Sequence, residues 1–310
     1  MMNTKRSRTH SLLIRSFALG VALSAGLSAT LPQGALPLAT AAISSASSQS
    51  VYNQFAAYLK DPAMLSQARK YLLNHIHETM PHHATLMVLQ LENAQHKDID
   101  AFAAKFDTTT VQQALDRAAR KGKLTFTSLL QHLTDKGTIR LLEMARDRGY
   151  KLETMEGMYY PVVNYTEYDR YARYVKPDIA AYIRIRTQET VKPSSGDAAL
   201  LISWGDVVKR ALEREQFLDS YPVSNRREAV QGLMKISRMQ LFYGLNNTPL
   251  FDYESGRIQP DALAAYQAAL KQGAGDSKLL ALLEQFLDVV KSNGGKRTTE
   301  VDAFLKKHVE

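Results

Sequence analysis

The chain has 310 residues with 39 Lys and Arg, 31 Asp and Glu, a formal net charge of +8, and no cysteine. The missing cysteines exclude disulfides, thiol nucleophiles and zinc–thiolate sites. The basic residues form no clustered stripe, so a nucleic-acid partner is not expected.

Residues 1–41 have the three parts of a signal peptide. The first part carries four cations and no acidic residue: Lys5, Arg6, Arg8 and Arg15. An apolar stretch follows at 17–31, and Ala39 and Ala41 are small residues at the positions that a signal peptidase requires. A membrane-spanning helix would need about 20 continuous apolar residues. We therefore expect cleavage before Ala42 and a mature chain with no transmembrane segment.

Removal of this leader would lower the net charge from +8 to +4, because 35 basic residues would then face 31 acidic ones. The predicted location is extracellular or at the cell surface. Such a location limits the expected partners to cell-wall polymers, surface proteins and environmental ligands, and a mildly basic chain suits an anionic surface. The oligomeric state is left open.

The mature chain begins with a serine-rich stretch at 42–50, which predicts a flexible start. Asp61 and Pro62 have the pattern of an N-cap and first helical residue, and Pro81 opens a second helix. The run at 86–91 is apolar on all sides, so this second helix is expected to be the central buried one. A short helix is expected near 98–106.

Three compact helices are predicted to end at Gly122, Gly137 and Gly149, each with basic residues in the last turns. Gly149 and Gly157 interrupt the helical pattern, which indicates a boundary near 150–160. We therefore divide the mature chain into an N-terminal helical subdomain at 51–154 and a C-terminal helical subdomain at 155–310.

The C-terminal subdomain starts with a tyrosine-rich segment and has a Pro/Gly/Ser-rich linker at 191–196 and a polar loop at 244–257. The alternating segment 180–186 fits either a strand or a helix. Further helices are predicted at 204–219, 225–243, 260–272, 277–291 and 299–308. The expected fold is all-α, as a multi-helix bundle or as stacked helical hairpins.

The run from Phe217 to Ser224 joins two of these helices through Tyr221 and Pro222. Helix, then Tyr-Pro-x-Ser, then helix resembles the junction between tetratricopeptide-like helical repeats. The resemblance covers about 30 residues, occurs once, and has no 34-residue period to support it. It implies stacked helical hairpins and names no partner.

Four of the eight histidines lie within ten residues: His75, His77, His82 and His83. A zinc-protease helix needs two histidines at i and i+4 with a glutamate between them. Here His77 is followed by His82 at i+5 and Pro81 interrupts the helix. These histidines are interpreted as part of a solvated helix–helix turn, with a metal site as the alternative.

Seven of the 15 tyrosines lie between residues 159 and 182. Tyrosine combines a flat apolar ring with a polar tip, and interleaved charges are typical of a binding face. The predicted ligand-binding residues are Tyr159, Tyr160, Tyr165, Tyr168, Asp169, Arg170 and Arg173. The alternative is a tyrosine-rich packing seam between the two subdomains.

No pattern assigns a catalytic residue, a metal ligand or a cofactor. The expected function is that of a secreted helical binding or scaffold protein, non-enzymatic, acting at or outside the cell envelope. One alternative is a wall-active glycan hydrolase with Glu156 or Glu254 as the acid, since glycan cleavage uses paired carboxylates. Another is a structural component of a coat or matrix.

Overall fold

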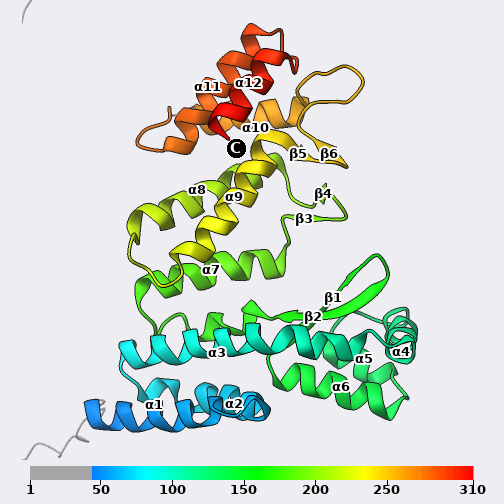
Figure 1. Ribbon diagram of the computed structural model, residues 1–310, viewed down its shortest axis with the longest axis vertical. Coiled ribbons are helices and arrows are strands. Elements are labelled where there is room, and N and C mark those ends of the chain that lie inside the picture. Colours follow the sequence, from blue (N-terminus) through cyan, green and yellow to red (C-terminus); the bar gives the residue numbers. More distant parts are fainter. Residues whose placement is uncertain (1–43, 272, 310) are drawn as a thin grey trace, which may run out of the picture. The chain divides into compact units, whose positions relative to one another are not determined.

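The computed structural model describes residues 44–271 and 273–309, which belong to one compact unit. The signal peptide predicted at 1–41 lies outside these residues. The described part is predominantly helical, and its strands form three two-stranded antiparallel hairpins (Figure 1). The predicted all-α class is confirmed.

The first helices are α1 (Ser45–Leu59), α2 (Leu65–His75) and α3 (Pro81–Ala103), and all three contact one another. Helix α3 is long and contributes many core side chains, as the apolar run at 86–91 predicted. It packs on α1 and α2 on one side and contacts the first hairpin on another, so it is central to this half of the fold (Figure 1).

The serine-rich start is helical from Ser45 onward, so the prediction of a flexible start is wrong for residues 45–50. The side chain of Ser44 caps α1 by accepting a hydrogen bond from the backbone N–H of Ser47. Ser48 is buried, and its hydroxyl lies 2.7 Å from Nδ1 of His83 on α3. A serine that caps a helix or reaches a buried partner favours structure over a mobile tail.

Helices α4 (Thr109–Ala119), α5 (Phe126–His132) and α6 (Lys136–Asp147) follow. Each begins at a side-chain cap, supplied by Thr108, Thr125 and Asp135. Gly149 follows α6 with a φ of 84°, a conformation that glycine adopts readily. Gly137 was expected to end a helix, but it lies in the first turn of α6, because Asp135 starts a new helix there.

The strands β1 (Tyr150–Met155) and β2 (Met158–Val163) form an antiparallel hairpin, where a break in the helical pattern was expected. Its turn consists of Glu156 and Gly157, which have φ angles of 52° and 79°. Two successive positive φ angles match the twist of a tight hairpin. One face of the hairpin is buried against α3 and α4.

Two short 3₁₀ turns, η4 (Tyr165–Glu167) and η5 (Asp169–Tyr171), lead into α7 (Pro177–Val191). The ambiguous segment 180–186 is therefore helix. Helix α7 contacts both 3₁₀ turns and also α8 (Trp204–Ser220) (Figure 1).

The remaining helices are α9 (Arg227–Tyr243), α10 (Pro260–Leu270), α11 (Lys278–Ser292) and α12 (Thr299–His308), within two residues of the predicted bounds. Between them lie two small hairpins: β3 (Ser195–Gly196) with β4 (Ala199–Leu200), and β5 (Gly244–Leu245) with β6 (Thr248–Pro249). Hairpin β5–β6 starts the predicted loop at 244–257.

The buried apolar side chains form two clusters, and α8 contributes to both. The first cluster runs from Val51 to Ile185 and also includes Phe217 of α8 and Val230 of α9; the second runs from Ile202 to Leu305. The division along the chain thus falls near the linker at 191–196. Strand β2 and the tyrosine segment pack with the first cluster, although they were assigned to the C-terminal subdomain.

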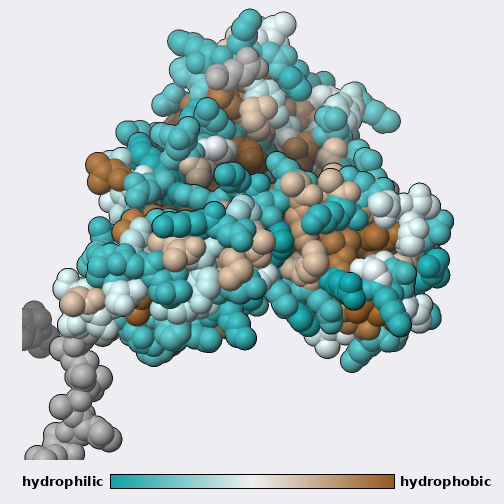
Figure 2. Space-filling view, turned by 60° about the horizontal axis from the view of Figure 1, so that its bottom comes forward, coloured by the Kyte–Doolittle hydropathy of each residue, from teal (hydrophilic) through white to brown (hydrophobic). Residues whose placement is uncertain are grey.

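The face seen in Figure 2 is largely hydrophilic, with hydrophobic residues gathered in separate patches. Over residues 44–271 and 273–309, none of the helices is both long and apolar enough to cross a membrane.

Candidate functional site

A pocket of about 370 Å³ lies where α3, the β1–β2 hairpin, the turn η4, α7 and α9 meet. Its polar lining consists of His96, Glu153, Tyr165, Arg186, Glu189 and Thr190. Its apolar lining consists of Ile99, Val162, Val163 and Leu233. Small-molecule sites are typically concave and mainly apolar, with a few polar groups that fix the ligand. This pocket is concave and combines apolar residues with a larger number of polar ones.

A buried carboxylate lies directly behind the pocket. Glu92 of α3 has a side chain only 3% exposed, and its Oε1 accepts hydrogen bonds from the hydroxyls of Tyr165 and Tyr182, each at 2.5 Å. Nε2 of His96, one turn along α3, lies 2.9 Å from the Tyr165 hydroxyl. The wall of the pocket is thus connected to a carboxylate through one tyrosine.

Arg226, at the start of α9, supplies the countercharge for Glu92. Its Nε donates to Oε2 of Glu92 at 2.8 Å, and its Nη2 donates to Oδ1 of Asn93 at 2.7 Å. A buried carboxylate is tolerated only when it is paired and its lone pairs are hydrogen-bonded. The two tyrosines and Arg226 meet that requirement.

These contacts fix the protonation states in the cluster. Burial on its own raises the pKa of Glu92, but the hydrogen bond with His96, the charge of Arg226 and the two tyrosine hydroxyls together lower it to about 2. Burial and the charge of Glu92 raise the pKa values of Tyr165 and Tyr182. At neutral pH Glu92 is therefore an anion and both tyrosines are neutral donors.

Arg186 of α7 is the cation in this pocket that has no acidic partner. Its guanidinium carbon lies 4.3 Å from the centre of the Tyr165 ring, and its Nε is buried with no hydrogen-bond partner. Within the described residues no carboxylate lies within 4 Å of its guanidinium nitrogens as an ion-pair partner. A largely buried guanidinium with an N–H that finds no acceptor in the protein lowers the stability of the fold, because that donor has lost its water without gaining a hydrogen bond.

The two acidic residues that line the pocket are already paired. Glu189 accepts from Arg210 at 2.8 Å and from Arg214 at 2.5 Å, and Glu153 lies 3.1 Å from Nζ of Lys151. They do not neutralise Arg186, so the pocket retains one cation without a partner.

The structure separates the predicted ligand-binding residues into a buried and an exposed group. Tyr159, Tyr165 and Tyr168 are buried, at 9%, 2% and 2% exposure, and the hydroxyl of Tyr168 donates to Oε1 of Gln95. These rings pack in the first cluster, so they cannot form an exposed recognition face. Tyr165 alone of the three reaches the pocket.

The other members lie at the surface. Tyr160 is half-buried, and Asp169, Arg170 and Arg173 are exposed. Oδ1 of Asp169 accepts from the hydroxyl of Thr187 at 2.8 Å, and the Arg173 guanidinium donates to its neighbouring tyrosine. These polar side chains do not line the pocket.

Glu92, Arg186 and Arg226 were not predicted. Glu92 directly follows the apolar run at 86–91, and a carboxylate on a helix expected to be buried signals an ionic partner. Arg186 stands four residues after Tyr182, which places the two on one face whether the segment is a helix or a strand. Arg226 had no local signal, since its partner is 134 residues away.

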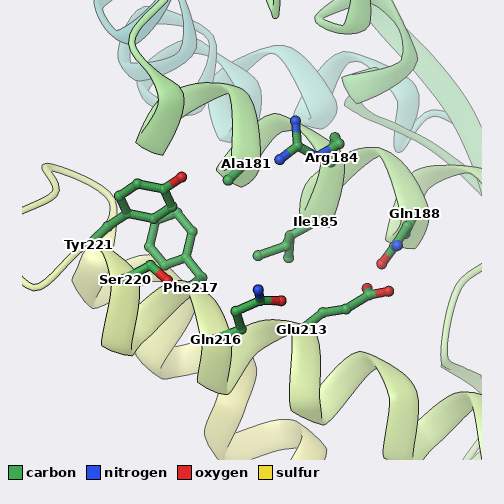
Figure 3. Close-up of a pocket in the computed structure, with 9 residues that line it drawn as sticks. All are labelled: Ala181, Arg184, Ile185, Gln188, Glu213, Gln216, Phe217, Ser220 and Tyr221. Atoms are coloured by element: carbon green, nitrogen blue, oxygen red, sulfur yellow. The ribbon is translucent and has the colours of Figure 1, made fainter. Parts of the chain in front are cut away.

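A second pocket, of about 310 Å³, lies between α7 and α8. Figure 3 shows Arg184 and Gln188 entering it from α7 and Glu213 and Gln216 from α8. Arg184 is exposed, so water already solvates its charge. This pocket therefore lacks the unsatisfied group that marks the first one.

The histidine-rich turn and the two candidate acids have ordinary surroundings. Nδ1 of His75 lies 2.9 Å from Oε1 of Glu78, and the described residues contain no group of three or more side chains that could hold a metal ion. Glu156 and Glu254 are exposed in turns and line neither pocket.

The chain matches no family model, no curated protein and no solved structure.

Proposed function

We propose that this is an exported, non-enzymatic binding protein that takes a small ligand in the pocket beside Tyr165 at or outside the cell envelope. The observation that supports this most is the guanidinium of Arg186, whose buried Nε has no hydrogen-bond partner, in a pocket lined by both polar and apolar side chains. A ligand whose polar group binds this guanidinium would offset part of the cost of burying it.

The protonation states favour binding over catalysis. A general acid or base works best when its pKa lies near the working pH. The pKa of Glu92 is about 2, and the tyrosine pKa values are raised, so none of these groups changes protonation near neutrality. Fixed donors and a fixed anion suit a site that holds its ligand unchanged.

Binding is tested with the mature chain, residues 42–310, and a library of acids, bases, sugars and soluble wall-polymer fragments. We expect at least one chemical class to raise the melting temperature, and to be recovered unchanged as judged by NMR. A ligand converted to a product would contradict the non-enzymatic assignment. A library without any binder would contradict the small-ligand site.

Export is tested separately by N-terminal sequencing of the protein from the culture medium. We expect the sequence to begin at Ala42, because small residues occupy the two recognition positions before it. Secreted protein that still begins with Met1 would rule out the predicted cleavage.

A further inference from the structure

We infer that the ligand is a small organic monocarboxylate, with its carboxylate on Arg186 and its apolar part against Val162, Val163 and Leu233. This inference rests on the proposed binding function and adds the chemical class. A guanidinium is a planar fork that matches the two oxygens of a carboxylate. The apolar residues line the same pocket from β2 and α9.

The charge of the surroundings selects a single negative charge. Arg186 is one cation, whereas Glu153 and Glu189 line the same pocket and Glu92 lies behind Tyr165. The cations that pair with these carboxylates do not line the pocket, so the second charge of a dianion such as a phosphate monoester would meet the carboxylates of Glu153 and Glu189 more directly than their partners. The single charge of a monoanion is matched by Arg186, the one cation that lines the pocket among the described residues.

The Tyr165 ring holds the guanidinium of Arg186 in place. The guanidinium lies over the ring of Tyr165, and that ring is held by the hydrogen bond from its hydroxyl to Glu92. A guanidinium that lies over an aromatic ring is stabilised by the π electrons of the ring. The N–H groups in the guanidinium plane remain available to bind a carboxylate. The pocket volume of about 370 Å³ is near the lower end of the range for small-molecule sites, which limits the ligand to a small acid.

The test measures binding of three matched probes to the mature chain by isothermal titration calorimetry. The probes are 4-methylpentanoate, its neutral amide and the phosphate monoester of 4-methylpentanol. We expect the carboxylate to bind about 10-fold or more tightly than either of the others, which is the range for a charged hydrogen bond. Equal binding of carboxylate and amide to the wild-type protein would overturn the inference without any variant.

The residue assignment is tested with Arg186→Gln and Arg186→Lys. We expect Arg186→Gln to weaken carboxylate binding about 10-fold or more and to leave amide binding unchanged, with Arg186→Lys in between. The matched control is Arg184→Gln, two residues earlier on α7 and facing the second pocket (Figure 3). Carboxylate binding that survives Arg186→Gln in a folded variant would overturn the assignment.

The outcomes separate the two proposals. If neutral or basic members of the broad library bind and carboxylates do not, the pocket is a binding site and only the carboxylate inference fails. If no library member binds, the proposed function itself fails.

Discussion

At the scale of single residues, the most informative feature is the buried carboxylate of Glu92. Glu92 is buried with two tyrosines and Arg226, and these contacts hold its pKa at about 2. Such a group stabilises the folded chain only while it is ionised. The stability of the protein in acid should therefore report on this cluster.

We predict that Glu92→Gln destabilises the protein by about 3–5 kcal/mol at pH 7, because it leaves Arg226 buried without a countercharge. The folded pKa of Glu92 is depressed from 4.5 to about 2, so its ionic contribution is complete above about pH 4.5 and is lost as the pH falls toward 2. Urea titrations at pH 7 and pH 3 should show a smaller difference between wild type and variant at pH 3.

The matched control for this prediction is Glu153→Gln, which lines the same pocket from a partly exposed position beside Lys151. Its cost should stay below about 1 kcal/mol, the range of surface ion pairs. A difference between wild type and Glu92→Gln that is equal at pH 7 and pH 3 would contradict the ionised, stabilising role of Glu92.

At the scale of elements, helices were predictable where local chemistry decides them. Ser203 caps α8 through the N–H of Asp206, and Pro260 opens α10, and helices were predicted to begin at residues 204 and 260. The β1–β2 hairpin was missed because Gly157 signals only a turn, while the pairing of Tyr150 with Val163 depends on a core formed elsewhere.

The candidate site was predictable only in part for the same reason. The tyrosine-rich segment was recognised as important, and Tyr165 does line the pocket. Burial could not be inferred, since the tyrosine hydroxyls find partners on α3 such as Glu92 and Gln95, about 70 residues away. Contacts between residues so far apart in the chain produce no periodic pattern in the sequence.

Gly244 shows how one residue determines a connection between elements. It ends α9 with a φ of 74° and a ψ of −148°, in a region that is essentially restricted to glycine. An added Cβ would lie 2.5 Å from the backbone nitrogen of Leu250 and would also approach the carbonyl of Thr248. The tight turn into β5–β6 therefore leaves no room for a side chain.

We predict that Gly244→Ala destabilises the protein by more than about 2 kcal/mol, from backbone strain and overlap together. Gly157→Ala is the matched control, since Gly157 also has a positive φ, of 79°, but nothing lies within 4 Å of an added Cβ. The control should cost about 1–2 kcal/mol, from strain alone. Equal costs in urea denaturation would show that the close approach at Gly244 is relieved by small shifts.

At the scale of the whole described part, one question is how the two apolar clusters are joined. Helix α8 carries Phe217 in the first cluster and Val208 in the second. Arg214, also on α8 and only 3% exposed, pairs with Glu189 of α7 at 2.5 Å and donates to the carbonyl of Leu233 on α9 at 3.0 Å. One buried guanidinium thus holds three helices together where the clusters meet.

We predict that wild type unfolds in a single transition and that Arg214→Met separates the two clusters, because the variant leaves Glu189 with Arg210 alone and removes the tie to α9. Trp204 is the only tryptophan and is buried in the second cluster, so its fluorescence reports on that cluster, whereas far-UV circular dichroism reports on all helices. The two urea transitions should coincide in wild type and differ in the variant.

The control for this separation is Lys192→Met, which removes an exposed ion pair between the end of α7 and Asp206 of α8. Both partners are solvated, so this pair contributes little and the two transitions should still coincide. If Arg214→Met lowers the stability but keeps the fluorescence and circular dichroism transitions together, apolar contacts along α8 couple the clusters and the buried ion pair does not. If the transitions separate in Arg214→Met alone, the polar contacts of Arg214 make the two clusters unfold as one.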